Sequence, residues 1–260
     1  MKKFIFILAN VLFANLVVVN AQELTKDQNN KLLNAGQGTT VNLSGLLKED
    51  MPLIGYRKIV LPGPQYIISD DPEYIRVPEA VAVREKVQPG TVRLYVYNVN
   101  AVQDPSKTER KITAVIKNLG TEEMHLKMLR YSSQKPSTDY FGIAKQGLVD
   151  YFNSVPQTKP VLVNPGETVS IDQKLETNRV KYDELVHGFY EFVIDQPGEV
   201  SVVQTDPKVS GTVAANRIVE VHPSSRTNAG RGLFGVSNYL VIARDTLDTA
   251  KPVSKIIVAD

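Results

Sequence analysis

The chain of 260 residues contains no cysteine and no tryptophan, and it has three histidines. Without cysteine it forms no disulfide, no thiolate metal site and no cysteine nucleophile. The histidines, His125, His187 and His222, have neither the H-x-x-x-H nor the H-E-x-x-H spacing of a zinc site. The nearest match to a nucleophile elbow, residues 235–239 (GVSNY), lacks the second glycine. We therefore expect no catalytic residue, no metal and no cofactor.

Long apolar runs are also scarce, and the longest lies at the N-terminus. Lys2 and Lys3 precede an apolar stretch over residues 4–19, and Val19 and Ala21 occupy the small-residue positions of a cleavage site. The stretch is shorter than the roughly 20 apolar residues that a membrane span needs. We predict a secretory signal peptide over residues 1–21, cleaved after Ala21, with an uncleaved anchor as the alternative. No membrane span is expected after cleavage.

The missing cysteine also bears on the source and location of the chain. Exported eukaryotic domains of this size usually contain disulfides, so the sequence favours a bacterial exporter. The expected location is secreted, in the extracellular space or the cell envelope.

An excess of charge of one sign is missing too. Signal cleavage removes two lysines and no acid, which leaves 28 basic and 28 acidic side chains. A chain without net charge has no global positive field to concentrate nucleic acid or anionic lipid. We therefore expect no nucleic-acid partner.

Composition divides the rest of the chain into a polar N-terminal arm over residues 22–50 and a β-sandwich domain over residues 51–260. In the arm, Thr25 and Gln28 match a capping box, which predicts one short helix. Beyond the arm, short runs of β-branched and aromatic residues alternate with Pro, Gly, Asn and Asp. The expected fold is mainly β, an immunoglobulin-like or jelly-roll-type antiparallel β-sandwich.

Several strands and turns are predicted in this domain. Residues 91–99 have apolar side chains at alternate positions, as in a strand with one buried face. Residues 111–117 and 124–129 flank a short turn and predict a β-hairpin. Pro-Gly pairs at 164–167 and 196–199 predict type II turns. The remaining predicted strands are 160–163, 168–175, 188–194, 200–204, 211–221, 239–243 and 254–258.

One segment, at about 138–154, has helical rather than β periodicity, and we predict one inserted α-helix there. Ser137 or Thr138 is the expected N-cap. Gly142 and Gly147 lower helix propensity, and we attribute them to close approach of the helix to a sheet. The apolar residues that recur at three- and four-residue spacing are Phe141, Ala144, Leu148 and Phe152, with Tyr140 and Tyr151 beside them. Of these we expect the four aromatic residues, Tyr140, Phe141, Tyr151 and Phe152, to be buried.

The loop over residues 223–232 is the candidate binding site of the chain. Arg226 and Arg231 flank glycines whose backbone amides can bind an anion. Asn228 lies between them, and His222 directly precedes the loop. A flexible surface loop without a ligand is the alternative interpretation.

Four segments carry a resemblance to known proteins: residues 71–74 (DPEY), 90–100 (GTVRLYVYNVN), 137–145 (STDYFGIAK) and 230–234 (GRGLF). Over about residues 54–260 the chain resembles uncharacterised secreted bacterial proteins that carry a copper amine oxidase-like N-terminal domain. The resemblance implies a non-catalytic β-rich module of the envelope or extracellular space, not the quinone-containing oxidase. The chain has no Asn-Tyr-Asp/Glu cofactor-forming tripeptide and no copper-ligand histidine pair, and no functional residue is carried over.

Together these features predict a secreted, non-enzymatic β-sandwich module. It would act by surface contact with the cell envelope, a matrix polymer or an extracellular protein partner. The alternative is a secreted hydrolase with a His/carboxylate site on the loop edge, and a third option is an envelope component that self-assembles through free strand edges. An exposed apolar patch favours the contact module, whereas a pocket that joins His187 or His222 to an acid favours the hydrolase.

Overall fold

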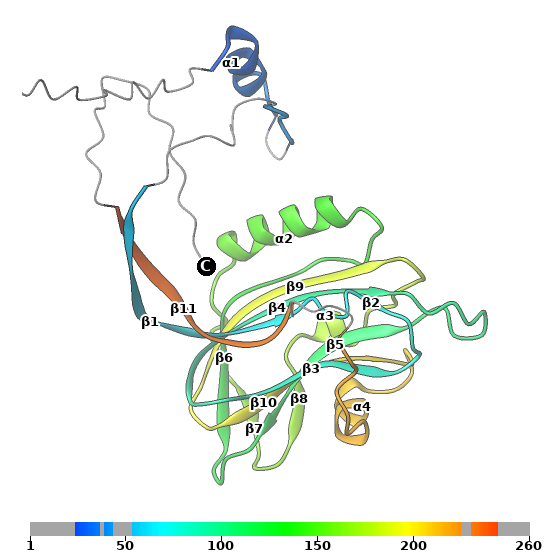
Figure 1. Ribbon diagram of the computed structural model, residues 1–260. Helices are drawn as coiled ribbons and strands as arrows, with labels where there is room; N and C mark the ends of the chain where they lie inside the picture. Colours follow the sequence, from blue (N-terminus) through cyan, green and yellow to red (C-terminus); the bar gives the residue numbers. More distant parts are fainter. Residues whose placement is uncertain (1–23, 37–38, 44–53, 225–229, 244–260) are drawn as a thin grey trace, which may run out of the picture. The chain divides into compact units, whose positions relative to one another are not determined.

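The structure is a computed structural model, and it describes residues 24–36, 39–43, 54–224 and 230–243 (Figure 1). The chain divides into two compact units, residues 1–58 with 241–260 and residues 59–240. Arg226, Asn228 and the predicted strand at 254–258 lie outside the described residues.

The first unit contains α1 (Lys26–Leu33). The Thr25 hydroxyl accepts a hydrogen bond from the Gln28 backbone N–H at 3.2 Å, and the Thr25 N–H donates to the Gln28 side chain at 3.0 Å. This reciprocal pair is the capping box that the sequence predicts. The short helix of the N-terminal arm is confirmed.

Two sheets make up the β-rich part of the chain. The larger has seven strands in the order β11-β1-β4-β9-β6-β7, with β2 paired to β4, and the smaller has the order β3-β10-β5-β8. The strands of the larger sheet are β1 (Tyr56–Ser69), β2 (Tyr74–Ile75), β4 (Gly90–Asn100), β6 (Met124–Ser133), β7 (Val161–Val163), β9 (Leu185–Ile194) and β11 (Arg231–Ala243). Those of the smaller sheet are β3 (Ala80–Val87), β5 (Lys111–Asn118), β8 (Thr168–Ser170) and β10 (Gly198–Thr205).

Alternate residues of both sheets form one buried cluster. Val92, Leu94 and Val96 of β4 are fully buried, in agreement with the alternation in the sequence, and Ile112 and Ile116 of β5 belong to the same cluster. A mainly β chain with two sheets and a few short helices confirms the predicted β-sandwich with a helical insertion. Most strand pairs are antiparallel, but β1 and β2 each pair with β4 in parallel.

The predicted hairpin of residues 111–117 with 124–129 is wrong. β5 pairs with β10 and β8, whereas β6 pairs with β9 and β7, so the chain crosses between sheets at this connection. The Asn118 side chain donates to the carbonyl oxygens of Glu122 at 2.7 Å and Val163 at 2.9 Å, which holds the crossing. A short turn with alternating flanks does not distinguish a hairpin from a crossing.

Two predicted strands contain helices. Within residues 211–221 the chain forms α4 (Gly211–Arg217), because Ser210 caps the helix and Ala214 and Ala215 favour helical geometry. The predicted strand at 168–175 ends at Ser170, and α3 (Gln173–Glu176) follows with Asp172 as its N-cap. In both places a capping side chain overrides the β-branched residues nearby.

The two predicted type II turns have different outcomes. Gly166 has a φ of 75°, and the Glu167 N–H donates to the Asn164 carbonyl at 3.0 Å, as the prediction requires. Gly198 does not have the positive φ that a type II turn requires, and it is instead the first residue of β10. The second turn prediction is therefore wrong. A β-carbon at Gly198 would lie 3.1 Å from Cδ1 of Ile116, so glycine at this position avoids a tight contact with the core.

Candidate functional site

The inserted helix is α2 (Tyr140–Asn153), and it lies along the larger sheet (Figure 1). Its N-cap is Asp139, whose carboxylate accepts from the Gly142 N–H at 3.0 Å, so neither Ser137 nor Thr138 has the predicted capping role. A β-carbon at Gly142 would collide with this carboxylate. Gly142 therefore serves the cap rather than sheet contact.

Gly147 provides the close approach to the sheet that the sequence predicts. A β-carbon at this position would lie 2.3 Å from Cε1 and Nδ1 of His187, near the start of β9. On the same helix face, the Tyr151 ring stacks on Phe189 with the ring centroids 4.3 Å apart. The face of α2 that is turned to the sheet thus centres on Gly147 and Tyr151, its two buried residues.

A polar contact fixes the same face of the helix. The Tyr151 hydroxyl donates to Oε2 of Glu191 at 3.0 Å, and Arg93 binds this oxygen through Nε at 2.9 Å and Nη2 at 2.5 Å. Burial raises the pKa of Tyr151 to about 12, against the lowering effect of Arg93. The hydroxyl therefore stays protonated and remains the donor of this bond.

A neighbouring face of α2, turned away from the sheet, presents apolar side chains to solvent. Phe141 is 81% exposed and Phe152 is 65% exposed. The prediction that Phe141 and Phe152 are buried is wrong, whereas the same prediction for Tyr151 is confirmed, because Gly147 and Tyr151 take the sheet-facing positions. We call the exposed group the outer stripe; its members are Phe141, Leu148, Val149 and Phe152 of α2, with Val155 just after the helix.

The structure brings two of the predicted binding residues together. The Arg231 guanidinium donates to the carbonyl oxygens of His222, of Ala82 at 3.3 Å and of Asp71 at 3.5 Å. The His222 N–H donates to the Val81 carbonyl at 2.8 Å. Arg231 thus ties the start of β11 to neighbouring backbone, while Arg226 and Asn228 lie outside the described residues.

The histidines lie on separate elements. His187 is 1% exposed, and neither of its ring nitrogens has a hydrogen-bond partner among the described residues. Burial lowers the pKa of His187 to about 4. His125 lies at the surface on β6, where its Nδ1 is 2.7 Å from Oδ2 of Asp195. Within the described part of the chain, no cluster of three or more His, Asp or Glu residues could hold a metal.

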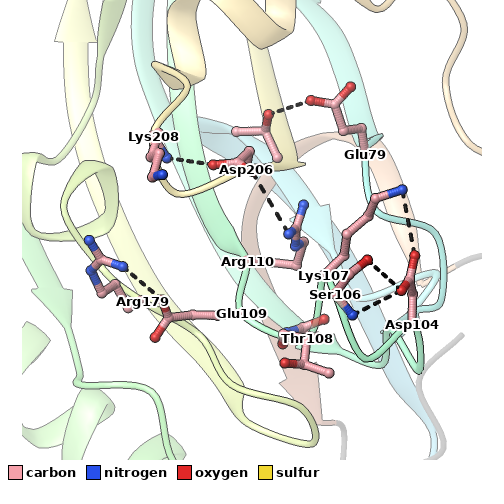
Figure 2. Close-up of polar contacts among 12 residues, drawn as sticks. Glu79, Asp104, Ser106, Lys107, Thr108, Glu109, Arg110, Arg179, Asp206 and Lys208 are labelled. Carbon is pink, nitrogen blue, oxygen red and sulfur yellow. Dashed lines mark hydrogen bonds and ion pairs between the residues drawn. The ribbon is translucent and has the colours of Figure 1, made fainter.

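A second site lies where β5 begins and β10 ends, and sequence reasoning missed it (Figure 2). Here Arg110 borders a cavity of about 210 Å³. Its Nη2 is 4.0 Å from Oδ2 of Asp206, and Arg179 pairs with Glu109 at 2.7 Å. The signal in the sequence is that Arg110 lies two residues before Ile112, and so on the side of the strand that Ile112, Ala114 and Ile116 turn to the main core.

Comparison with protein-family models, with curated proteins and with solved structures found no match. The resemblance to copper amine oxidase-like N-terminal domains therefore stays a prediction. In the described ranges, no helix is both long and apolar enough to span a membrane.

Proposed function

We propose that the chain is a secreted, non-enzymatic β-sandwich module that binds a protein partner through the outer stripe of α2. The observation that supports this most is that one helix exposes four large apolar side chains, Phe141, Leu148, Val149 and Phe152. Monomeric proteins rarely expose large contiguous apolar patches, and such patches commonly mark interaction sites.

The spacing within the outer stripe fits recognition of a helix by an apolar groove. Phe141, Leu148 and Phe152 are separated by seven and four residues, which places them on one side of the helix. Grooves that bind amphipathic helices use anchors at this spacing. Full burial of each such side chain contributes roughly 1.5–3 kcal/mol.

The helix is already ordered before any partner binds. The Asp139 cap, the contact of Gly147 with His187 and the stack of Tyr151 on Phe189 hold it against the sheet. Binding therefore carries little additional cost for folding the helix. This preorganisation supports a contact role for α2.

A protein fits the outer stripe better than a lipid surface or a polymer does. The helix contains one cation and one anion, Lys145 and Asp150, whereas helices that bind anionic membranes have many basic residues. The side chains of the outer stripe carry no hydrogen-bonding group to match the hydroxyls of a glycan. An apolar groove on a protein needs neither basic residues nor hydrogen-bonding groups from the helix, so it fits the outer stripe.

The hydrolase alternative has less support. His187 is buried beneath α2 without a hydrogen-bond partner among the described residues, and no carboxylate contacts the His222 ring in the same part of the chain. His125 does pair with Asp195, but both side chains are about half exposed and line none of the described cavities. A base needs a protected site near its substrate to be effective.

Site-specific photocrosslinking tests the proposal. A photoreactive phenylalanine analogue is placed at Phe152 in the outer stripe, and a matched probe is placed at Val219, which is 80% exposed away from α2. Both proteins are expressed in the producing cells and irradiated. We expect one discrete protein adduct from position 152 and none from position 219.

Several results would count against the proposal. Equal adducts from both positions would mean nonspecific contact, and adducts with lipid alone would identify a membrane surface instead. Retention of the protein inside the cell would contradict the secreted location.

A further inference from the structure

Arg110 carries a charge into the interior of the sandwich. It directly precedes β5. Because side chains alternate along a strand, Arg110 lies on the same side as Ile112, Ala114 and Ile116, which are fully buried in the main core. Only 6% of its side chain is exposed. A charged group at such a position is stable only with close, hydrogen-bonded partners.

Among the residues that the structure describes, Arg110 lacks such partners, whereas Lys111 has them. Nζ of Lys111 donates to Oε1 of Glu176 at 3.0 Å and to the Val209 carbonyl at 2.9 Å. Nε of Arg110 is buried without a partner, and its nearest carboxylate oxygen among the described residues, on Asp206, is 4.0 Å away. That distance is beyond hydrogen-bonding range. The guanidinium therefore has free donors for a ligand.

The cavity beside Arg110 has the size and chemistry for an oxyanion. Its volume is about 210 Å³, and it is lined by two further cations, Arg179 and Lys208. Within the described chain, Nζ of Lys208 has no ion-pair partner. The two acids that line the cavity are already engaged: Glu109 pairs with Arg179, and Asp206 accepts from the Lys208 N–H at 2.9 Å (Figure 2).

A wider cleft adjoins this cavity, because Arg179 lines both. The cleft has a volume of about 580 Å³ and is lined by three lysines, Lys135, Lys174 and Lys181. Its one acidic lining residue is Glu184, whose carboxylate accepts from the Lys181 N–H at 2.7 Å. In a chain with balanced charge, this local excess of cations is a strong electrostatic feature.

We propose that Arg110 binds one oxyanion group, phosphate or carboxylate, of an extended polyanion, and that the rest of this ligand passes Arg179 into the lysine-lined cleft. The planar guanidinium fork suits two parallel hydrogen bonds to such a group. The site is independent of the outer stripe on α2.

Calorimetric titration of the full chain with inorganic phosphate, tripolyphosphate and citrate tests the site. We expect tripolyphosphate to bind about tenfold more tightly than phosphate, because it reaches the cleft as well. Arg110→Met should weaken tripolyphosphate binding by about ten- to a hundredfold, the usual range for a charge-assisted hydrogen bond. The affinity of citrate relative to tripolyphosphate shows whether the oxyanion preferred is carboxylate or phosphate.

Matched variants make the result decisive. Arg110→Lys keeps the charge but lacks the fork, so it should also lose affinity even if Arg110→Met fails to fold. Lys208→Gln should weaken binding. Lys86→Gln should not, because Lys86 is exposed at the end of β3 that pairs with the start of β10, whereas the site lies at the end of β10. Failure of the wild type to bind any of the three probes at millimolar concentration would overturn the proposal. Equal affinity of the wild type and both Arg110 variants would overturn it as well.

Discussion

Gly147 of α2 lies so close to His187 of β9 that a β-carbon at 147 would come within 2.3 Å of the imidazole. The contact determines the rotation of the helix about its axis. With Gly147 and Tyr151 toward the sheet, Phe141 and Phe152 lie roughly a third of a turn away around the helix axis, where they are exposed. One glycine thus accounts both for the burial of His187 and for the exposure of the outer stripe.

Gly147→Ala should destabilise the protein. The added methyl group cannot fit against the buried ring, and overpacking of this kind costs about 1–3 kcal/mol. Helix propensity alone gives the opposite sign, a gain of up to about 1 kcal/mol. The free energy of unfolding from urea denaturation distinguishes the two.

Gly55→Ala is the control for this measurement, because no atom lies within 4 Å of a β-carbon at Gly55. We expect its free energy of unfolding to match that of the wild type. A more stable Gly147→Ala variant would contradict the close contact between α2 and β9.

His187 should make the stability depend on pH. Burial lowers its pKa from 6.5 to about 4, so between these values the unfolded chain binds a proton that the folded protein does not. Stability therefore falls as the pH drops through this window, by at most about 3 kcal/mol. Urea unfolding at a series of pH values measures the effect.

His187→Leu removes the titrating group, so its stability should decline less over the same pH window. Phe141→Ser, a substitution at an exposed position without a titratable group, should follow the wild-type profile. Parallel profiles for His187→Leu and the wild type would show that His187 is not buried in its neutral form.

The sequence predicted the β-sandwich and the inserted helix because strand alternation and helical spacing leave local signals. It did not predict which face of α2 is buried. Phe141, Leu148 and Phe152 have the spacing of a buried face, but so do Gly147 and Tyr151, and only contact with His187 decides between them. Apolar periodicity finds a helix but not its partner.

The second site illustrates a different limit. The sequence shows that Arg110 lies on the core-facing side of its strand. Whether it finds a partner depends on residues nearly a hundred positions away, around Asp206. Likewise, the partners of β5 were not predictable, because β10 and β8 come much later in the chain. Pairings over such sequence distances have no local pattern.

Substitution of Phe141 by serine should leave stability almost unchanged. The side chain is 81% exposed, and substitutions at such positions usually change the free energy of unfolding by about 0.5 kcal/mol or less. Phe192→Ala in the fully buried core of β9 should instead cost about 3–5 kcal/mol. Thermal unfolding of the two variants checks the contrast, and a large loss for Phe141→Ser would mean that the outer stripe is part of the core.

Signal cleavage can be tested directly. The expected mature protein begins at Gln22, so the intact mass of protein recovered from the culture medium or envelope should correspond to residues 22–260. A Val19→Asp variant, which disrupts the cleavage site, should retain residues 1–21. Recovery of the wild type at its full mass would support the uncleaved anchor.

The most direct test of the protein-binding role is the affinity of the crosslinked partner, once purified, for the wild type and for the Phe141→Ser, Phe152→Ser double variant. Because interface anchors often contribute about 2 kcal/mol each, the loss of two should cost about 4 kcal/mol, and we expect the double variant to bind roughly a thousandfold more weakly. Val219→Ser should bind like the wild type. Unchanged affinity in the double variant would contradict the assignment of the outer stripe as the binding surface.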